Sequence, residues 1–302
     1  MLETDARDRV IVALDCDRER ALELAHELSG HAAWLKVGMT LYYAEGPEIV
    51  KTFKDLGFKV FLDLKFHDIP HQVRGAARSA SLAGADLLSV HGLGSGAMLA
   101  ACREGAEEAR EDRAKLVAIT VLTSMNQDAL SEIGVESPVA EEAARLAKLA
   151  QANGIDGIVC SPMEAHDMRE LLGPDALIVT PGVRPVGAAL GDQSRVATPS
   201  QAIECGASHI VVGRPITGAD DPVAAFDAIV AELVENVAQK IPLSHHFWVS
   251  LAQNSPCSCV NFPILCVESQ VRGLTLGAVY CTFCGYRLTY GPAIGHFVRS
   301  TC

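Results

Sequence analysis

Residues 59–70 read Lys-Val-Phe-Leu-Asp-Leu-Lys-Phe-His-Asp-Ile-Pro, and this stretch joins an apolar run to a dense group of charged side chains. The run at residues 59–62 is typical of a strand that is buried on both faces in a parallel sheet. Asp63 and Lys65 follow at its end, and Pro70 prevents a regular helix from passing through the stretch. The pattern predicts a buried strand that carries charge where it leaves the sheet.

The same kind of apolar run recurs along the chain. The eight runs cover residues 10–14, 34–37, 59–62, 87–90, 116–121, 155–159, 177–179 and 210–212. Helical patterns separate them, and some of these begin with a capping residue followed by proline, as at Ser161-Pro162 and Thr198-Pro199. Repeated β–α units over about 230 residues predict a (β/α)8 TIM barrel over residues 1–237. An open doubly wound sheet is the alternative, although it favours a glycine-rich first turn where this chain has Asp15-Cys16-Asp17.

A glycine that ends a helix and leads directly into a strand also recurs. The three instances are Gly84-Ala85-Asp86, Gly154-Ile155-Asp156 and Gly206-Ala207-Ser208. Glycine is favoured just past a helix end because it adopts left-handed backbone angles without strain. The repetition supports short, regular connections between the helices and the strands.

The composition restricts the class of protein. The chain has 302 residues, of which 49% are apolar and 21% charged, so it can form a core. Its net charge of −12 and the lack of a long basic run argue against nucleic acid or a membrane surface as a partner. No run of about 20 apolar residues exists to span a bilayer. Residues 1–8 are polar and acidic, unlike a secretory signal, so we expect a cytoplasmic protein.

The last 65 residues, 238–302, differ from the rest and form a cysteine-rich extension of unknown structure. Six of the ten cysteines lie there: Cys257, Cys259, Cys266, Cys281, Cys284 and Cys302. The Cys281–Cys284 spacing suits half of a zinc site, but Cys257–Cys259 is not a usual second pair. We therefore predict no metal. The extension is either poorly ordered or unrelated to the activity of the barrel, and the sequence leaves both open.

Charged side chains gather at the ends of the first three predicted strands. Asp15 follows the first, Lys36 lies in the second, and Asp63 and Lys65 end the third. A lysine inside an apolar strand is unfavourable unless it is paired. Neighbouring carboxylates, with Asp68 as a second one, keep the Lys65 ammonium protonated, which suits a proton donor rather than a Schiff-base nucleophile. A salt-bridge network that closes the mouth of the barrel is the structural alternative.

Two later segments indicate a phosphate site. Residues 181–185, Pro-Gly-Val-Arg-Pro, lead into a loop that ends in Gly-Asp-Gln at 191–193. Gly213 and Arg214 follow the eighth predicted strand, where barrels commonly bind phosphate. Glycine lets the backbone approach the phosphate oxygens, and arginine supplies bidentate charge.

These segments resemble the signature segments of bacterial orotidine 5′-phosphate decarboxylases. The similar segments are residues 12–15, 35–38, 63–70, 122–124, 181–185 and 212–216, and the resemblance covers about 8–237 in order. It implies a homodimeric barrel that converts orotidine 5′-phosphate to UMP and carbon dioxide, the last step of de novo pyrimidine nucleotide synthesis. It also implies that no metal or organic cofactor takes part.

The resemblance also implies roles for individual residues. Lys65 would protonate C6 of the pyrimidine, Asp63 would lie beside the departing carboxylate, and Lys36 would hold Asp63 and a ribose hydroxyl. Asp68, together with Ile69, would reach across the dimer into the active site of the partner.

The substrate-binding residues implied by the resemblance are Asp15, Lys36, Asp63, Ile69, Gln72, Thr123, Arg184, Gln193, Gly213 and Arg214. Many relatives have Asn-Thr after the Ile-Pro pair, whereas this chain has His71-Gln72, so the contact made by Gln72 is the least defined.

Two other functions stay open at this point. One is a magnesium-dependent decarboxylase or aldolase of the same barrel superfamily that acts on a keto-sugar phosphate. The other is a non-catalytic nucleotide-binding module that has kept the fold. The loop from residues 181–185 to 191–193 favours the pyrimidine substrate over the first.

Overall fold

The computed structural model describes residues 1–185, 197–239, 265–271, 274–280, 287–290 and 298–300. The chain divides into two compact units, Met1–Ile241 and Pro242–Cys302.

Eight parallel strands close into a barrel in the first unit, each paired with its neighbours in sequence order. The strands are β1 (Val10–Leu14), β2 (Trp34–Gly38), β3 (Lys59–Phe66), β4 (Leu87–His91), β5 (Lys115–Ile119), β6 (Gly157–Val159), β7 (Leu177–Thr180) and β8 (His209–Val212). Val12 of β1 pairs with Val212 of β8, which closes the ring. The predicted (β/α)8 barrel is confirmed, and the open doubly wound sheet is wrong.

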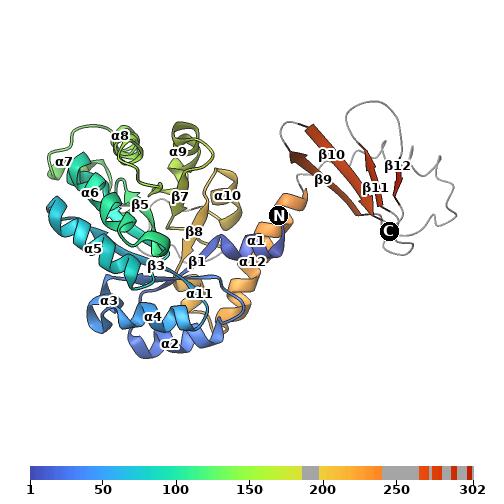
Figure 1. The fold of residues 1–302 in the computed structure, drawn as a ribbon, viewed down its shortest axis with the longest axis horizontal. Coiled ribbons are helices and arrows are strands. Elements are labelled where there is room, and N and C mark those ends of the chain that lie inside the picture. Colours follow the sequence, from blue (N-terminus) through green and yellow to red (C-terminus); the bar gives the residue numbers. More distant parts are fainter. Residues whose placement is uncertain (186–196, 240–264, 272–273, 281–286, 291–297, 301–302) are drawn as a thin grey trace. The chain divides into compact units, whose positions relative to one another are not determined.

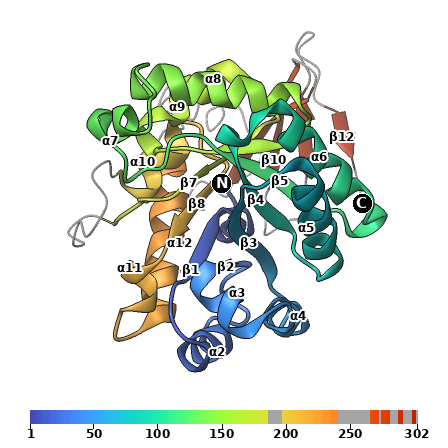
Figure 2. The same cartoon turned by 90° about the vertical axis from the view of Figure 1, so that its left-hand side faces the viewer.

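Helices surround the barrel on its outside (Figures 1 and 2). They are α1 (Glu3–Asp8), α2 (Arg18–Glu27), α3 (Met39–Glu45), α4 (Glu48–Asp55), α5 (Pro70–Leu82), α6 (Ser95–Glu107), α7 (Gln127–Glu132), α8 (Val139–Ala152), α9 (Ala165–Leu172), α10 (Pro199–Glu204), α11 (Arg214–Thr217) and α12 (Pro222–Gln239). Short 3-10 helices are η1 (Gly92–Gly94), η2 (Arg110–Asp112) and η3 (Pro162–Glu164). The predicted capping residues Ser161 and Thr198 both form capping boxes followed by proline.

The barrel interior is an apolar layer covered by a polar one. Alternate strand residues point inward, and a buried apolar cluster is formed by Ile11, Ala13, Trp34, Phe61, Leu87, Val117, Ile119, Val159, Val179 and Val211. Lys36, Asp63 and Ser89 come two residues after Trp34, Phe61 and Leu87, so they share the inward face nearer the carboxyl ends of the strands. The apolar layer therefore forms the floor beneath these polar side chains.

The segments Gly84–Asp86 and Gly206–Ser208 form hydrogen bonds between neighbouring strands at the amino ends of the strands, opposite the polar layer. Asp86 accepts a hydrogen bond from Val60 N–H at 2.7 Å, and Ser208 accepts one from Ile178 N–H at 3.1 Å. In each case the side chain just before one strand binds the backbone of the preceding strand. The repeated sequence pattern is thus a strand clamp as well as a helix end.

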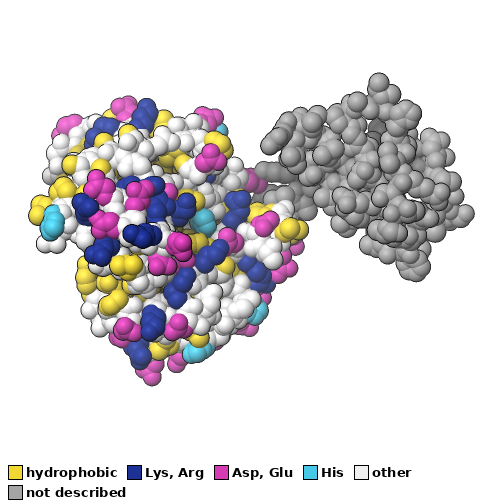
Figure 3. All heavy atoms as spheres, viewed as in Figure 1, with side chains coloured by type: hydrophobic (Ala, Val, Ile, Leu, Met, Phe, Trp, Pro, Cys, Tyr) yellow, Lys and Arg dark blue, Asp and Glu magenta, His cyan; other side chains and the backbone are white. Residues whose placement is uncertain are grey.

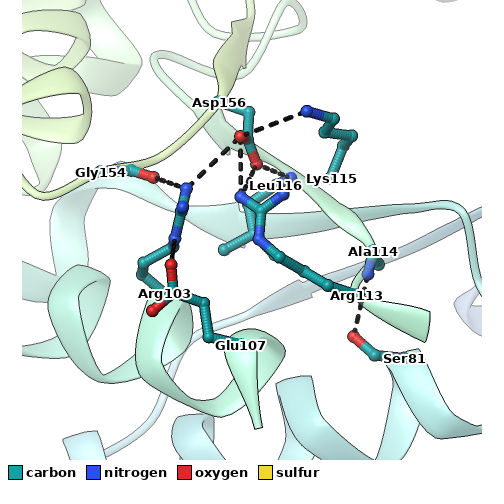
Figure 4. A network of polar contacts seen from close by, with 9 residues as sticks. All are labelled: Ser81, Arg103, Glu107, Arg113, Ala114, Lys115, Leu116, Gly154 and Asp156. Atoms are coloured by element: carbon teal, nitrogen blue, oxygen red, sulfur yellow. Dashed lines mark hydrogen bonds and ion pairs between the residues drawn. The ribbon is translucent and has the colours of Figure 1, made fainter. Parts of the chain in front are cut away.

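The third clamp is the most highly charged (Figure 4). Asp156 accepts from Leu116 N–H at 2.8 Å, and Arg113 Nη2 donates to both Asp156 carboxylate oxygens, at 2.8 and 2.7 Å. Arg103 lies 3.4 Å from the same carboxylate and also donates to the Gly154 carbonyl. The network lies at the amino ends of the strands, the end of a TIM barrel that contributes to stability rather than to catalysis. We therefore assign it a structural role.

The second unit contains a four-stranded antiparallel sheet in the order β12-β11-β10-β9. The strands are β9 (Leu265–Val271), β10 (Leu274–Tyr280), β11 (Arg287–Tyr290) and β12 (Val298–Ser300). The cysteines weighed for zinc, at positions 257, 259, 281 and 284, lie outside the described residues. Among the helices that the structure describes, none has both the length and the apolar character needed to cross a lipid bilayer.

Candidate active site

A row of alternating charges lies across the carboxyl ends of β1, β2 and β3. Lys36 Nζ is 2.8 Å from Asp15 Oδ1 and 3.7 Å from Asp63 Oδ2. Lys65 Nζ donates to the same Asp63 oxygen at 3.0 Å. The structure therefore brings together four of the residues that the sequence singled out, with Asp63 between two ammonium groups.

The Asp63 carboxylate is held in its ionised form. Its side chain is only 13% exposed, and burial by itself would raise its pKa. The positive charges of Lys36 and Lys65, with hydrogen bonds from Ser89 and Lys65, outweigh burial and hold the Asp63 pKa below its usual value. A fixed negative charge beside Lys65 follows from this arrangement.

Lys65 has an unusual backbone. Its φ of +52° lies in the left-handed region that lysine rarely occupies. The register between β3 and β4 is regular as far as Leu62, which pairs with Leu88, and then shifts so that Phe66 pairs with Val90. The strand that carries the catalytic lysine candidate is thus bulged at the lysine itself.

At this bulge, the side chain of Ser89 in β4 provides the hydrogen-bond acceptor for the Lys65 backbone. Its Oγ accepts from Lys65 N–H at 2.9 Å and donates to Asp63 Oδ1 at 2.7 Å. The sequence motifs do not single out Ser89, because a serine in an apolar strand is common. Its inward position, two residues after Leu87, was the available signal.

Gly38, the last residue of β2, leaves room for the charged row. A Cβ added there would lie 3.0 Å from Asp15 Oδ1 and 3.2 Å from Lys36 Nζ. Both distances are tighter than ordinary van der Waals contact, so any larger side chain must displace one of the two groups.

The loop between β3 and α5 presents Asp68 and Ile69 to the outside. Asp68 is exposed, Ile69 is 63% exposed, and Gln72 lies exposed in the first turn of α5. Asp68 Oδ1 accepts from Ile69 N–H at 2.6 Å. Within the described part of the chain, Asp68 forms no ion pair with Lys65, so the structure does not bring this predicted residue into the row of charges.

Two stacked histidines support the base of this loop. The rings of His67 and His91 are 5.0 Å apart and inclined by 19°. His91 Nδ1 accepts from Leu93 N–H, which places its proton on Nε2. Burial, with smaller contributions from His67 and Lys65, lowers the pKa of His91 to about 4, so the ring is neutral at pH 7.

The predicted phosphate residues lie at the ends of β7 and β8, next to β1 in the barrel. Gly213 caps α11, which begins at Arg214, and Arg184 follows β7. An isolated bridge pairs Val183 with Ala197, and Arg184 N–H donates to the Ala197 carbonyl at 3.0 Å. Val183 and Ala197 lie on either side of residues 186–196 in the sequence. Gln193 belongs to that segment and lies outside the described residues.

Thr123 is half-buried in the turn that follows β5. It therefore lies on the same end of the barrel as the charged row and the phosphate residues.

Comparison with known proteins identifies the family. The sequence model of the orotidine 5′-phosphate decarboxylase / HUMPS family matches residues 8–229. The chain belongs to this family. The orotidine 5′-phosphate decarboxylase of Moorella thermoacetica is 48% identical over 239 residues, which cover 77% of this chain and 95% of the relative. That of Cutibacterium acnes is 52% identical over 223 residues, covering 73% and 94%.

A solved structure agrees with these sequences. The crystal structure of the orotidine 5′-phosphate decarboxylase from Lactobacillus acidophilus matches with a TM-score of 0.68 and 40% sequence identity, covering 75% of this chain and 99% of that one. The resemblance predicted from the motifs is confirmed. Because these decarboxylases match almost over their full length, the keto-sugar-phosphate alternative and the non-catalytic module are not favoured.

Proposed function

We propose that Lys65, Asp63, Lys36 and Asp68 carry out the decarboxylation of orotidine 5′-phosphate to UMP and carbon dioxide. The chain is a decarboxylase of pyrimidine nucleotide biosynthesis, as its family and its relatives at 48% and 52% identity indicate. The contact between Lys65 Nζ and the ionised Asp63 carboxylate, at 3.0 Å, carries the assignment of roles.

Loss of carbon dioxide from C6 leaves an electron pair on carbon that the pyrimidine ring delocalises poorly. An ammonium group fixed beside C6 stabilises this charge as it develops. Lys65 then transfers a proton to C6, forming the C–H bond of UMP, and its neutral amine regains a proton from water. Asp63 accepts a hydrogen bond from Lys65 and so orients it before the reaction. We propose that no metal or organic cofactor takes part.

The rest of the substrate has matching groups around the same end of the barrel. We assign the ribose to Asp15, Lys36 and Thr123, and the phosphate to Arg184, Gln193, Gly213 and Arg214. With a net charge of −12 on the whole chain, the anionic substrate needs this local positive site. Binding of the remote phosphate supplies free energy that positions the pyrimidine at Lys65.

We propose that the functional unit is a homodimer in which Asp68 acts in the active site of the partner. The support is its exposure: Asp68 is exposed and, among the described residues, forms no ion pair with Lys65 of its own chain, and the neighbouring Ile69 has an apolar side chain that is 63% exposed. A second copy would bury this side chain and place Asp68 and Ile69 against substrate. Gln72, one turn further along, is the residue we assign to the edge of the same contact.

We also propose a cytoplasmic location. Cys16, Cys102 and Cys205 carry free thiols, which suits a reducing compartment. Neither nucleic acid nor a membrane is expected as a partner.

The test is an ultraviolet absorbance assay of the purified full-length chain with orotidine 5′-phosphate in EDTA. The wild type should convert it, and Lys65→Ala should lower kcat by about 1,000-fold or more, as loss of an electrostatic and proton-donating group does. Lys148→Ala, at an exposed position on α8, is the matched control and should keep the wild-type rate. A Lys65→Ala rate within about tenfold of wild type would contradict the assigned role, and a requirement for added Mg²⁺ would favour the keto-sugar-phosphate reaction.

A further inference from the structure

We propose that Ser89 is a positioning residue of the active site, which holds the Asp63 carboxylate and the Lys65 backbone in a single arrangement. This inference rests on the roles proposed for Asp63 and Lys65. Nothing in the sequence motifs or in the family resemblance pointed to Ser89.

Ser89 is completely buried and uses its hydroxyl in both directions. The Oγ accepts from Lys65 N–H at 2.9 Å and donates to Asp63 Oδ1 at 2.7 Å. The other Asp63 oxygen accepts from Lys65 Nζ at 3.0 Å. Both carboxylate oxygens are therefore engaged, so the carboxylate cannot rotate without breaking a hydrogen bond.

The bulge in β3 explains why a hydroxyl is needed at this position. Leu62 pairs with Leu88 and Phe66 with Val90, so three residues of β3 lie opposite Ser89 alone. A regular ladder would satisfy the Lys65 N–H with a carbonyl of the neighbouring strand. At the bulge, the Ser89 side chain takes over that acceptor role, and it supports the left-handed backbone of Lys65.

Removal of the hydroxyl should affect geometry and charge together. Without Ser89, one Asp63 oxygen loses its donor and the Lys65 N–H loses its acceptor, so the ammonium and carboxylate no longer share a fixed geometry. A misplacement of about 1 Å at a reacting group can lower a rate about 100-fold. The substrate-binding groups on β7 and β8 are untouched, so KM should change little.

The acid limb of the pH profile gives a second signature. The groups in contact with Asp63 are Lys36 of β2, Lys65 of β3 and Ser89 of β4. Asp15, after β1, does not contact Asp63 directly but forms an ion pair with Lys36. The hydrogen bond from Ser89 helps to lower the Asp63 pKa, so its loss should raise that pKa. The acid limb of the kcat/KM profile should then shift to higher pH, which an indirect packing defect would not produce.

The experiment compares Ser89→Ala and Ser89→Thr with Ser81→Ala in the full-length protein. Ser81 is the matched control, because it is also completely buried and its Oγ accepts from Ala114 N–H at 3.3 Å, away from the active site. We expect Ser89→Ala to lower kcat about 10- to 100-fold with KM within about threefold, and to shift the acid limb upward. Ser89→Thr keeps the hydroxyl and should recover most of kcat, and Ser81→Ala should match wild type.

A folded Ser89→Ala protein with kcat within about twofold of wild type and an unchanged acid limb would overturn the inference. So would a folded Ser89→Thr protein as slow as the alanine variant. If Ser89→Ala fails to fold, Ser89→Cys takes its place in the experiment. The thiol keeps the bulk of the side chain but is a weak hydrogen-bond donor, so Ser89→Cys should show the same loss of kcat. Failure of the proposed function is distinguished by Lys65→Ala, since an active Lys65→Ala enzyme removes the roles on which Ser89 depends.

Discussion

His209 connects the stability of the barrel to pH through a single side chain. It lies at the start of β8, with its ring 5.6 Å from that of Trp34 in an edge-to-face arrangement. Its buried Nδ1 has no hydrogen-bond partner in the described part of the chain. Burial lowers the pKa of His209 to about 4, with Arg9 and Lys59 adding to the effect and Asp8 opposing it. The folded protein therefore keeps this ring neutral where an unfolded chain would bind a proton.

We predict that His209→Phe makes stability less sensitive to acid. Neutral His209 contributes its full stabilising effect above the ordinary histidine pKa of 6.5, and this effect is lost as pH falls toward about 4. The wild type should lose up to about 1.4 kcal/mol per pH unit more than the variant across that window. Urea unfolding at several pH values measures the difference. His166→Phe, at a side chain that is 65% exposed, should keep the wild-type slope, and equal slopes in all three proteins would contradict the assignment.

Single residues also show what the sequence could and could not predict about the site. Lys36 was recognisable because a charge in an apolar strand must be paired, and Asp63 and Lys65 because they alternate along a strand. The inward position of Ser89 could be inferred from the sequence, but its two contacts could not, since they span 24 and 26 residues and depend on the register of β3 against β4. Asp68 was recognisable as a second carboxylate near Lys65 in the sequence, but its proposed role in the partner's site came from the resemblance alone, because that target belongs to another copy.

For the strands and the segments that connect them, the sequence also predicts the elements but not all of their contacts. All eight strands were predictable from apolar runs, yet β3 extends to Phe66, beyond the predicted end at residue 62, because its bulge keeps the polar residues within the sheet. The Gly-x-Asp segments were recognised as helix ends, whereas their clamping role was hidden. Asp86 and Asp156 bind strand N–H groups that lie 26 and 40 residues earlier in the chain, so the clamp becomes visible only when neighbouring strands are known.

The Asp156 clamp provides a prediction about stability. Asp156→Ala would leave Arg113, whose side chain is 17% exposed, without its carboxylate, and would leave Leu116 N–H without its acceptor. We expect the free energy of unfolding to fall by about 3 kcal/mol, as when one partner of a buried ion pair is removed. Chemical denaturation measures this change. Asp175→Ala, at an exposed position before β7, should change it by less than about 0.5 kcal/mol.

For Asp156→Ala, kcat at a temperature where the variant is folded should equal that of the wild type. The clamp lies at the amino ends of the strands, and the charged row lies at their carboxyl ends. A large loss of kcat in a folded protein would show that the two ends are coupled.

The charge of the whole molecule determines the long-range electrostatic field around the site. Acidic and basic side chains are intermixed on the face shown in Figure 3, and the net charge is −12. Such a surface does not attract an anionic nucleotide over long distances. The proposed site therefore relies on local groups: we propose that Arg184, Arg214 and the backbone at the ends of β7 and β8 bind the phosphate, and that a second copy completes the site. One barrel alone supplies Lys65 and Asp63 but keeps Asp68 outside.

A mixture of two inactive variants tests whether two copies share each site. Asp68→Ala retains Lys65, and Lys65→Ala retains Asp68, so a hybrid dimer would contain one complete site if Asp68 acts in the partner. After full exchange of equal amounts, half of the dimers are hybrids, and the activity should recover to about a quarter of wild type. Native mass spectrometry measures the exchange, and the ultraviolet assay measures the rate.

The matched control mixes Lys65→Ala with Asp63→Ala. Lys65 and Asp63 touch within one chain, at 3.0 Å, so every site in that hybrid lacks one of the two and no activity should return. Recovery with Asp68→Ala but not with Asp63→Ala therefore distinguishes a residue that acts across the dimer from one that acts within its own barrel. If hybrids form and neither mixture recovers, Asp68 acts in its own chain, and the β3–α5 loop must then move to bring its exposed carboxylate to Lys65.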